Sequence, residues 1–147
     1  MAKFPIDITA QAWVVDFLAQ PLLARLATAD PLSGQPHVVP VWYEWDGEYL
    51  YISAFKSTRK IRELERNPRI SVVVDVMDDV NHNRAVLFEG SAEIIVDPAV
   101  VAARSTSLYA RYLGEEGIRA AAPASWIVDP ENRIIRLKPE KVFAWNG

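Results

Sequence analysis

Runs of β-branched and aromatic residues dominate the hydrophobic pattern of the chain. These runs lie at residues 22–29, 37–45, 48–54, 69–76 and 84–96. Such composition favours half-buried strands, and clusters of turn-forming residues such as those at 30–36 separate them. The closing stretch 133–146 adds one or two further strands, divided by Pro139. The pattern therefore predicts a chain with more strand than helix.

The dipeptide Asp46-Gly47 joins two of these runs. Asp-Gly suits the positive φ values of a tight turn, so the runs at 37–45 and 48–54 are predicted to form a hairpin. Pro40 lies inside the first run, where a central strand would lose a ladder hydrogen bond. The strand that contains Pro40 is therefore expected at an edge or an opening of the sheet.

Two short stretches have the spacing of helices instead. The first begins at Thr9 as its N-cap and ends before Pro21. In the second, Ile61 and Leu64 stand three residues apart among charged residues, and the stretch ends near Pro68. Both are predicted to be helices packed on the surface of the sheet.

A third helix is predicted over residues 98–112. Asp97 precedes it as N-cap, Pro98 takes the first helical position, and Gly114 ends it. Gly90, inside the long run 84–96, predicts a bulge or a sharp bend of the kind that barrels need. Three or four helices inserted between hairpin-connected strands indicate an α+β barrel.

Length and composition place the chain among globular proteins. Its 147 residues are enough for one domain with its own core, so residues 1–147 are expected to form a single domain. The chain has no cysteine, which excludes disulfides and thiolate metal sites. No apolar segment is long enough to cross a membrane, so a cytoplasmic protein without a membrane partner is expected.

Most catalytic and metal-binding motifs are missing from the sequence. The two histidines, His37 at a strand end and His82 in a polar loop, form no zinc motif. Neither a dinucleotide-binding GxGxxG, a phosphate-binding P-loop nor a GxSxG nucleophile motif occurs. The paired carboxylates are adjacent in sequence, as on a solvated surface, rather than converging across a cleft. No catalytic residue and no metal ligand is predicted.

Residues 56–66 stand out because they carry five basic and two acidic side chains in a chain with a net charge of −3. Lys56, Arg59 and Lys60 fall around the start of the second predicted helix, where the helix dipole favours negative charge. A bound phosphate, held also by the hydroxyls of Ser57 and Thr58, would resolve this conflict. A solvated helix face is the other interpretation. General binding of nucleic acid is disfavoured, because it needs a broad basic face.

Residues 22–75, from "LLARLATADPLSGQPHVVPVWY" through "SAFKSTRKIRELERNP" to "VVVD", resemble the pyridoxamine 5′-phosphate oxidase-like superfamily. The likeness continues more weakly through "FEGSAEII" and "PEKVFAWN". It implies a six-stranded antiparallel split β-barrel with short flanking helices. It further implies a homodimer that binds its cofactor, FMN or coenzyme F-420, at the subunit interface.

The resemblance also implies which residues contact the cofactor. The segment that opens the short helix is expected to bind the cofactor phosphate, and the strand with Pro40 is expected to line the ring. The residues assigned in this way are Val38, Val39, Pro40, Val41, Trp42, Tyr43, Ser53, Ala54, Lys56, Ser57, Thr58, Arg59, Lys60 and Trp145.

The chain also departs from the true oxidases of the family. Val38 and Tyr43 replace an arginine and a lysine of the cofactor-binding strand, and the substrate-binding tail has no counterpart after Trp145. Oxidation of vitamin B6 is therefore not expected. The "VPVWY" arm and "RYLGEEG" are more similar to the branch that uses the deazaflavin coenzyme F-420. The acidic tail of that coenzyme would favour extra positive charge, for which the candidates are Arg62, Arg66, Arg104 and Arg111.

The function expected from these features is transfer of hydride or electrons between a flavin or deazaflavin and a small, planar, hydrophobic substrate. Two other functions fit a small aromatic-rich barrel. A noncatalytic carrier or sensor could store a flavin or haem in the same site. A barrel that binds single-stranded nucleic acid through aromatic and basic residues is the third, and the acidic net charge disfavours it.

Overall fold

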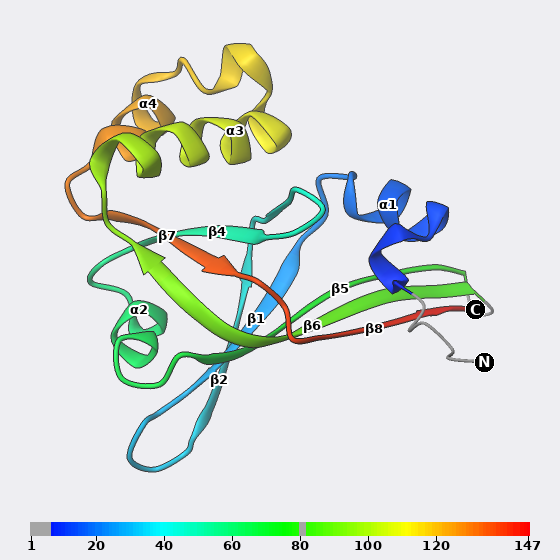
Figure 1. Cartoon of the computed structure of the whole chain (residues 1–147). Helices are drawn as coiled ribbons and strands as arrows, with labels where there is room; N and C mark the ends of the chain where they lie inside the picture. Colours follow the sequence, from blue (N-terminus) through cyan, green and yellow to red (C-terminus); the bar gives the residue numbers. More distant parts are fainter. Residues whose placement is uncertain (1–6, 80–81) are drawn as a thin grey trace.

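The computed structural model describes residues 7–79 and 82–147. In these residues, strands from one antiparallel sheet curl into a split barrel, and helices lie against its sides (Figure 1). The strand order is β2-β1-β5-β6-β7-β4-β3, and β8 pairs with β6. The strands are β1 (Ala24–Ala29), β2 (Pro36–Val41), β3 (Glu44–Trp45), β4 (Leu50–Phe55), β5 (Arg69–Asp79), β6 (His82–Ile95), β7 (Asn132–Leu137) and β8 (Lys141–Asn146).

The predicted fold class is confirmed, but the described residues form eight strands where six were expected. One reason is that the run 37–45 does not continue as a single hairpin arm. It breaks at Trp42 and Tyr43, so that β2 pairs with β1 and only the short β3 pairs with β4. The predicted turn is present, and Gly47 has φ 98°. The hairpin prediction was therefore right for the turn and wrong for most of the first arm.

The position of Pro40 agrees with its chemistry. β2 ends the strand order and pairs with β1, where Pro40 lies opposite Arg25. An edge strand tolerates a residue without an N–H group because one of its sides has no ladder. The expectation of an edge strand is confirmed.

Gly90 lies in β6, a strand of 14 residues that runs without a bulge at this point. The strand pairs with β8 up to Glu89, with β5 up to Ser91, and with β7 from Ala92 onward. A Cβ atom at Gly90 would lie 3.0 Å from Leu137 Cδ1 and 3.2 Å from the backbone nitrogen of Glu140. Of the two predicted alternatives, a bulge or a sharp bend, the continuous register rules out the bulge. The glycine is needed because the chain between β7 and β8 crosses close to its backbone.

The barrel interior is filled by aliphatic side chains and closed by the first helix. α1 (Ala12–Leu18) buries Val14, Phe17 and Leu18 in the same cluster as the strand residues. Thr9 is not its N-cap. It belongs to the short 3₁₀ helix η1 (Ile8–Ala10), whose N-cap Asp7 accepts a hydrogen bond from the Thr9 N–H. α2 (Arg59–Leu64) packs Ile61 and Leu64 into this cluster, as their spacing predicted.

Two further helices, α3 (Pro98–Gly117) and α4 (Ala121–Val128), lie together over β4 and β7 (Figure 1). Asp97 caps α3 by accepting from the N–H groups of Ala99 and Val100, as predicted. Gly114 breaks the helix with φ 75°, at the predicted end. A second buried cluster, which includes Leu108 and Tyr109, lies beneath α3. Among the described helices, none has the length and apolar character needed to span a membrane.

Candidate functional site

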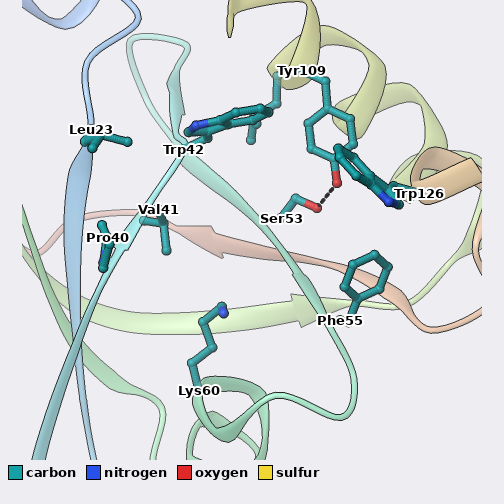
Figure 2. A pocket seen from close by; sticks show the side chains of 10 residues that line it. Leu23, Pro40, Val41, Trp42, Ser53, Phe55, Lys60, Tyr109 and Trp126 are labelled. Atoms are coloured by element: carbon teal, nitrogen blue, oxygen red, sulfur yellow. Dashed lines mark hydrogen bonds between the residues drawn. The ribbon is translucent and has the colours of Figure 1, made fainter. Parts of the chain in front are cut away.

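A cavity of about 420 Å³ lies between the barrel and the two helices α3 and α4 (Figure 2). It is bounded by the start of β1, the end of β2, the last residues of β4, the start of α2, and one face each of α3 and α4. The residues that line it are Leu23, Pro40, Val41, Trp42, Ser53, Phe55, Lys60, Leu108, Tyr109 and Trp126. Its volume falls in the range of small-molecule sites, and most of its lining is apolar.

One wall of the cavity is aromatic. The Trp42 ring stacks on Tyr112, with centroids 4.6 Å apart and an interplanar angle of 5°. Tyr109 stands edge-on to Trp42 at 5.9 Å and to Trp126 at 6.2 Å. Such stacked and edge-to-face pairs fix ring orientations beyond what burial alone does. The wall therefore offers flat, oriented surface to a planar ligand.

A chain of hydrogen bonds runs from the cavity into the protein. The hydroxyls of Tyr109 and Ser53 lie 2.7 Å apart, and Ser53 donates to Asn132 Oδ1 at 2.9 Å. Asn132 Nδ2 then donates to the hydroxyl of Ser105, which is fully buried. Burial raises the pKa of Tyr109 above its ordinary value, so its hydroxyl stays protonated at neutral pH. The network fixes Ser53 and Tyr109 as polar groups on an otherwise apolar surface.

Lys60 is the only charged side chain among the described residues that line the cavity. Its ammonium group points into the cavity from the first turn of α2 (Figure 2). Burial lowers its pKa below the ordinary value, because desolvation penalises the charged form. An anion in the cavity would offset this penalty.

The start of α2 has no side-chain cap. The first N–H groups of a helix lack partners within the helix. The N-cap residue Thr58 does not satisfy them, because its hydroxyl donates to the carbonyl of Phe55 at 2.8 Å instead. The first N–H groups of α2 and the Lys60 ammonium group therefore belong to the same turn of the helix.

The structure brings together five of the residues that the resemblance assigned to the cofactor: Pro40, Val41, Trp42, Ser53 and Lys60 line one cavity. Two others face away from it. Tyr43 is fully buried and its hydroxyl donates to the carbonyl of Leu18, while Ala54 packs into the barrel cluster. These two side chains could contact a ligand in the cavity only if the core moved.

The remaining assigned residues lie outside the cavity. Trp145 is on β8, paired with Ala85, and about half of its side chain is exposed. The assignment of all residues in this group to the cofactor stays a prediction. The residues in this group are Val38, Val39, Lys56, Ser57, Thr58, Arg59 and Trp145.

Arg59 and Lys60, adjacent in sequence, serve different surfaces. Arg59 Nε lies 3.4 Å from Glu63 Oε1, and its side chain lines a separate groove with Arg62 and Arg66. Glu63 is buried, accepts a hydrogen bond from Thr28, and contacts Arg59. The expected single phosphate cradle is therefore divided in this structure, with Lys60 alone reaching the cavity.

Arg104 and Arg111, the other candidates for an acidic tail, lie away from that groove. The Arg104 guanidinium stacks over the Tyr51 ring at 4.2 Å. Arg111 donates to backbone carbonyls, including that of Tyr43. Of the four arginines considered, Arg62 and Arg66 share a surface depression next to α2.

Five lining residues were missed by sequence reasoning: Leu23, Phe55, Leu108, Tyr109 and Trp126. Phe55 could have been found, because it lies two residues after Ser53 on one strand and therefore shares its face. Tyr109 and Trp126 carry no such signal, since the packing of α3 and α4 on the sheet places them. Among the described residues, no group of three or more histidine or acidic side chains is arranged to hold a metal ion.

Comparison with known proteins identifies the family. A family model described as pyridoxamine 5′-phosphate oxidase matches residues 11–146, so the chain belongs to this family. No curated protein sequence gave a match.

Solved structures with the same fold include three informative ones. A conserved hypothetical protein of Mycobacterium tuberculosis is 26% identical, with a TM-score of 0.81 over 99% of this chain and 90% of its own. An F-420 reductase is 29% identical, with a TM-score of 0.68 over 87% of this chain and 94% of its own. A haem storage protein of Vibrio cholerae is 18% identical, with a TM-score of 0.74 over 93% of this chain and 94% of its own, and shows the fold alone.

Proposed function

We propose that this member of the pyridoxamine 5′-phosphate oxidase family is an oxidoreductase that uses FMN or coenzyme F-420. The cavity beneath α3 holds the cofactor, and the substrate is small, planar and hydrophobic. One observation carries the proposal: an aromatic wall and a single half-buried lysine face the same space, and the lysine lies at an uncapped helix start. When bound, the cofactor supplies the hydride or electron chemistry.

The residues of the cavity fit such a group at both of its ends. A phosphate accepts hydrogen bonds from the Lys60 ammonium and from the first N–H groups of α2. A tricyclic ring lies against Trp42, where stacking on Tyr112 has already fixed the orientation of the indole. The hydroxyls of Ser53 and Tyr109 then hydrogen-bond the polar edge of the ring or of a substrate beside it.

The choice between the two cofactors depends on what lies beyond the phosphate. Both carry a tricyclic ring and a phosphate, so the cavity accepts either. The likeness to an F-420 reductase over 87% of this chain supports the deazaflavin. The groove next to α2 combines Arg59, Arg62 and Arg66 with Asp30, Glu63 and Glu65, so its charge favours neither cofactor.

We also propose that the protein acts as a homodimer with the cofactor at the subunit interface. Phe143 and Trp145 lie on β8 with alternating spacing, so both side chains emerge on the same face of the sheet. They are 45% and 47% exposed, and as neighbours on one face they offer apolar surface that a partner subunit would cover. Sedimentation of the wild type and of Trp145→Ser tests this, because the substitution should shift a dimer toward monomer.

A noncatalytic carrier is the alternative from another class. The described residues that line the cavity include no histidine or methionine, two common axial ligands of haem iron, and the chain has no cysteine. Storage of haem in this cavity is therefore less well supported than binding of a flavin. Turnover separates a carrier from an enzyme, since a carrier binds reduced cofactor without passing electrons to any acceptor in a broad panel.

The first experiment is titration with FMN and, separately, with coenzyme F-420, followed by absorbance and fluorescence. Lys60→Gln should weaken either cofactor by about 1.5–3 kcal/mol, the range for hydrogen bonds to charged groups. Lys138→Gln is the matched control, because it removes the same charge from an exposed side chain outside the cavity. Equal losses in the two variants, or no binding of either cofactor below high micromolar concentration, would overturn the assignment.

A further inference from the structure

We propose that Tyr112 is the positioning residue that holds Trp42 in the wall of the cavity. The inference rests on the proposed function in one respect, that the cavity binds a planar ligand. The feature that leads to it is the break between β2 and β3, where Trp42 and Tyr43 leave the strand ladder. Backbone groups at such a break need other partners, because burying them unpaired is costly.

Side chains of α3 supply these partners. The Tyr43 N–H donates to the Tyr112 hydroxyl at 2.9 Å, and the Tyr43 carbonyl accepts from Arg111 Nε at 3.1 Å. The Tyr112 hydroxyl also lies 3.1 Å from that carbonyl. The backbone N–H and C=O groups of Tyr43 are thus both satisfied by two consecutive residues of one helix. The break in the strand is therefore a built feature of the fold.

The same hydroxyl also bonds to the segment that leads into β1. It donates to the carbonyl of Leu22 at 2.8 Å, and Leu22 precedes the lining residue Leu23. Tyr43 directly follows the lining residue Trp42. One phenol oxygen therefore links these two chain segments just beyond the last ladder pair of β1 and β2, Ala24 and Val41.

The Tyr112 ring completes the arrangement. It lies parallel to the Trp42 indole at 4.6 Å, so the backbone and the ring of Trp42 are both fixed through Tyr112. Arg111 holds the helix itself in place by donating to the carbonyls of Leu18, Ala19 and Gln20 beyond α1. Tyr112 acts through Trp42 and does not itself line the cavity.

The test compares Tyr112→Phe, which keeps the ring, with Tyr112→Leu, which loses both ring and hydroxyl. Tyr51→Phe is the matched control, because Tyr51 packs in the same cluster beneath α3 and has a hydrogen-bonded hydroxyl, but lies outside the cavity lining. The ligand-free readout is the near-ultraviolet circular dichroism of the Trp42–Tyr112 stack, taken as the difference from the same variants carrying Trp42→Phe. The second readout is affinity for FMN and for coenzyme F-420.

We expect Tyr112→Phe to lower affinity by about tenfold, because it leaves the buried Tyr43 N–H unpaired. Tyr112→Leu should lower it further and abolish the stacking signal, while the control leaves both readouts near wild type. An unchanged dichroism and affinity in folded Tyr112→Phe would overturn the inference. So would equal losses in Tyr112→Phe and Tyr51→Phe, which would mark a general loss of stability.

The ligand-free signal separates this inference from the proposed function. If the wild type binds neither cofactor, the proposed function fails, yet the dichroism still decides whether Tyr112 orients Trp42. If the wild type binds and the Tyr112 variants keep both readouts, the function stands and the positioning role fails.

Discussion

The barrel interior and the region where α3 packs on the sheet, here called the α3 interface, are stabilised by different kinds of contact. In the barrel, fully buried side chains such as Leu26, Val72 and Phe88 make apolar contacts from alternating strand positions. Beneath α3, hydroxyl and amide groups such as those of Tyr109 and Asn132 hydrogen-bond across elements. Apolar burial stabilises without direction, whereas hydrogen bonds fix positions. The comparison indicates that the barrel supplies stability and the α3 interface supplies the geometry of the site.

Phe88→Ala should have the largest effect on stability. Phe88 is fully buried and packs against Trp45 with ring centroids 5.0 Å apart. Its truncation should lower the free energy of unfolding by about 3–5 kcal/mol, measured by urea denaturation. The control is Leu87→Ala, because Leu87 directly precedes Phe88 and points to the opposite face of the sheet. It should lower the free energy of unfolding by less. If folded Phe88→Ala lost as much free energy of cofactor binding as of unfolding, the barrel would not act separately from the site.

Asn132→Ala tests the other region. Asn132 is buried and bridges Ser53 and Ser105, so its removal leaves two hydroxyls without their partner. We expect a loss of about 1–3 kcal/mol in the free energy of unfolding, together with weaker cofactor binding. Calorimetry of unfolding and a cofactor titration measure the two effects. If stability fell while affinity stayed at the wild-type value, the network would have no part in shaping the site.

Cofactor affinity should depend on pH through Lys60. Burial lowers the pKa of Lys60 in the free protein, and a bound phosphate raises it again. Affinity should therefore fall as pH rises through the lowered pKa, by at most about tenfold per pH unit because one proton is involved. Protein stability should change in the opposite direction, since the unfolded chain holds this proton to higher pH. Titrations across the alkaline range should show this slope in the wild type and lose it in Lys60→Gln.

Arg59→Ala should have the smallest effect. Arg59 is half exposed and contacts Glu63 at 3.4 Å, outside the cavity. Because the substitution removes a charge that lies outside the cavity, we expect cofactor affinity to change less than in Lys60→Gln. A loss of affinity equal to that of Lys60→Gln would show that Arg59 turns toward the phosphate on binding. It would also restore the single cradle expected from the sequence.

Features that depend on neighbouring residues were predictable from the sequence. Asp97 caps α3 and Gly114 ends it because both act within one turn of the chain. The break in the run 37–45 was not predictable. The hydrogen-bond partners of the Tyr43 backbone are Arg111 and Tyr112, which lie 68 and 69 residues further along the chain. No local pattern marks such a contact.

The candidate site also has one part that the sequence predicts and another that it does not. The resemblance named Pro40, Trp42, Ser53 and Lys60, which the structure gathers around the cavity. It also named Ala54, although strand alternation places Ala54 opposite to Ser53, so the sequence held enough to exclude that side chain. The α3 and α4 wall escaped because its place depends on how two helices pack over the sheet.

The path of β6 links the two halves of the barrel. This strand pairs with β5 and β8 along its first part, up to Ser91, and with β7 from Ala92 onward, so the halves share one continuous backbone. Neither half can open without disturbing the strand that completes the other. We therefore expect the amide hydrogens on both sides of Gly90 to exchange with deuterium at similar, slow rates, through opening of the whole barrel. The shared strand makes the barrel one cooperative unit.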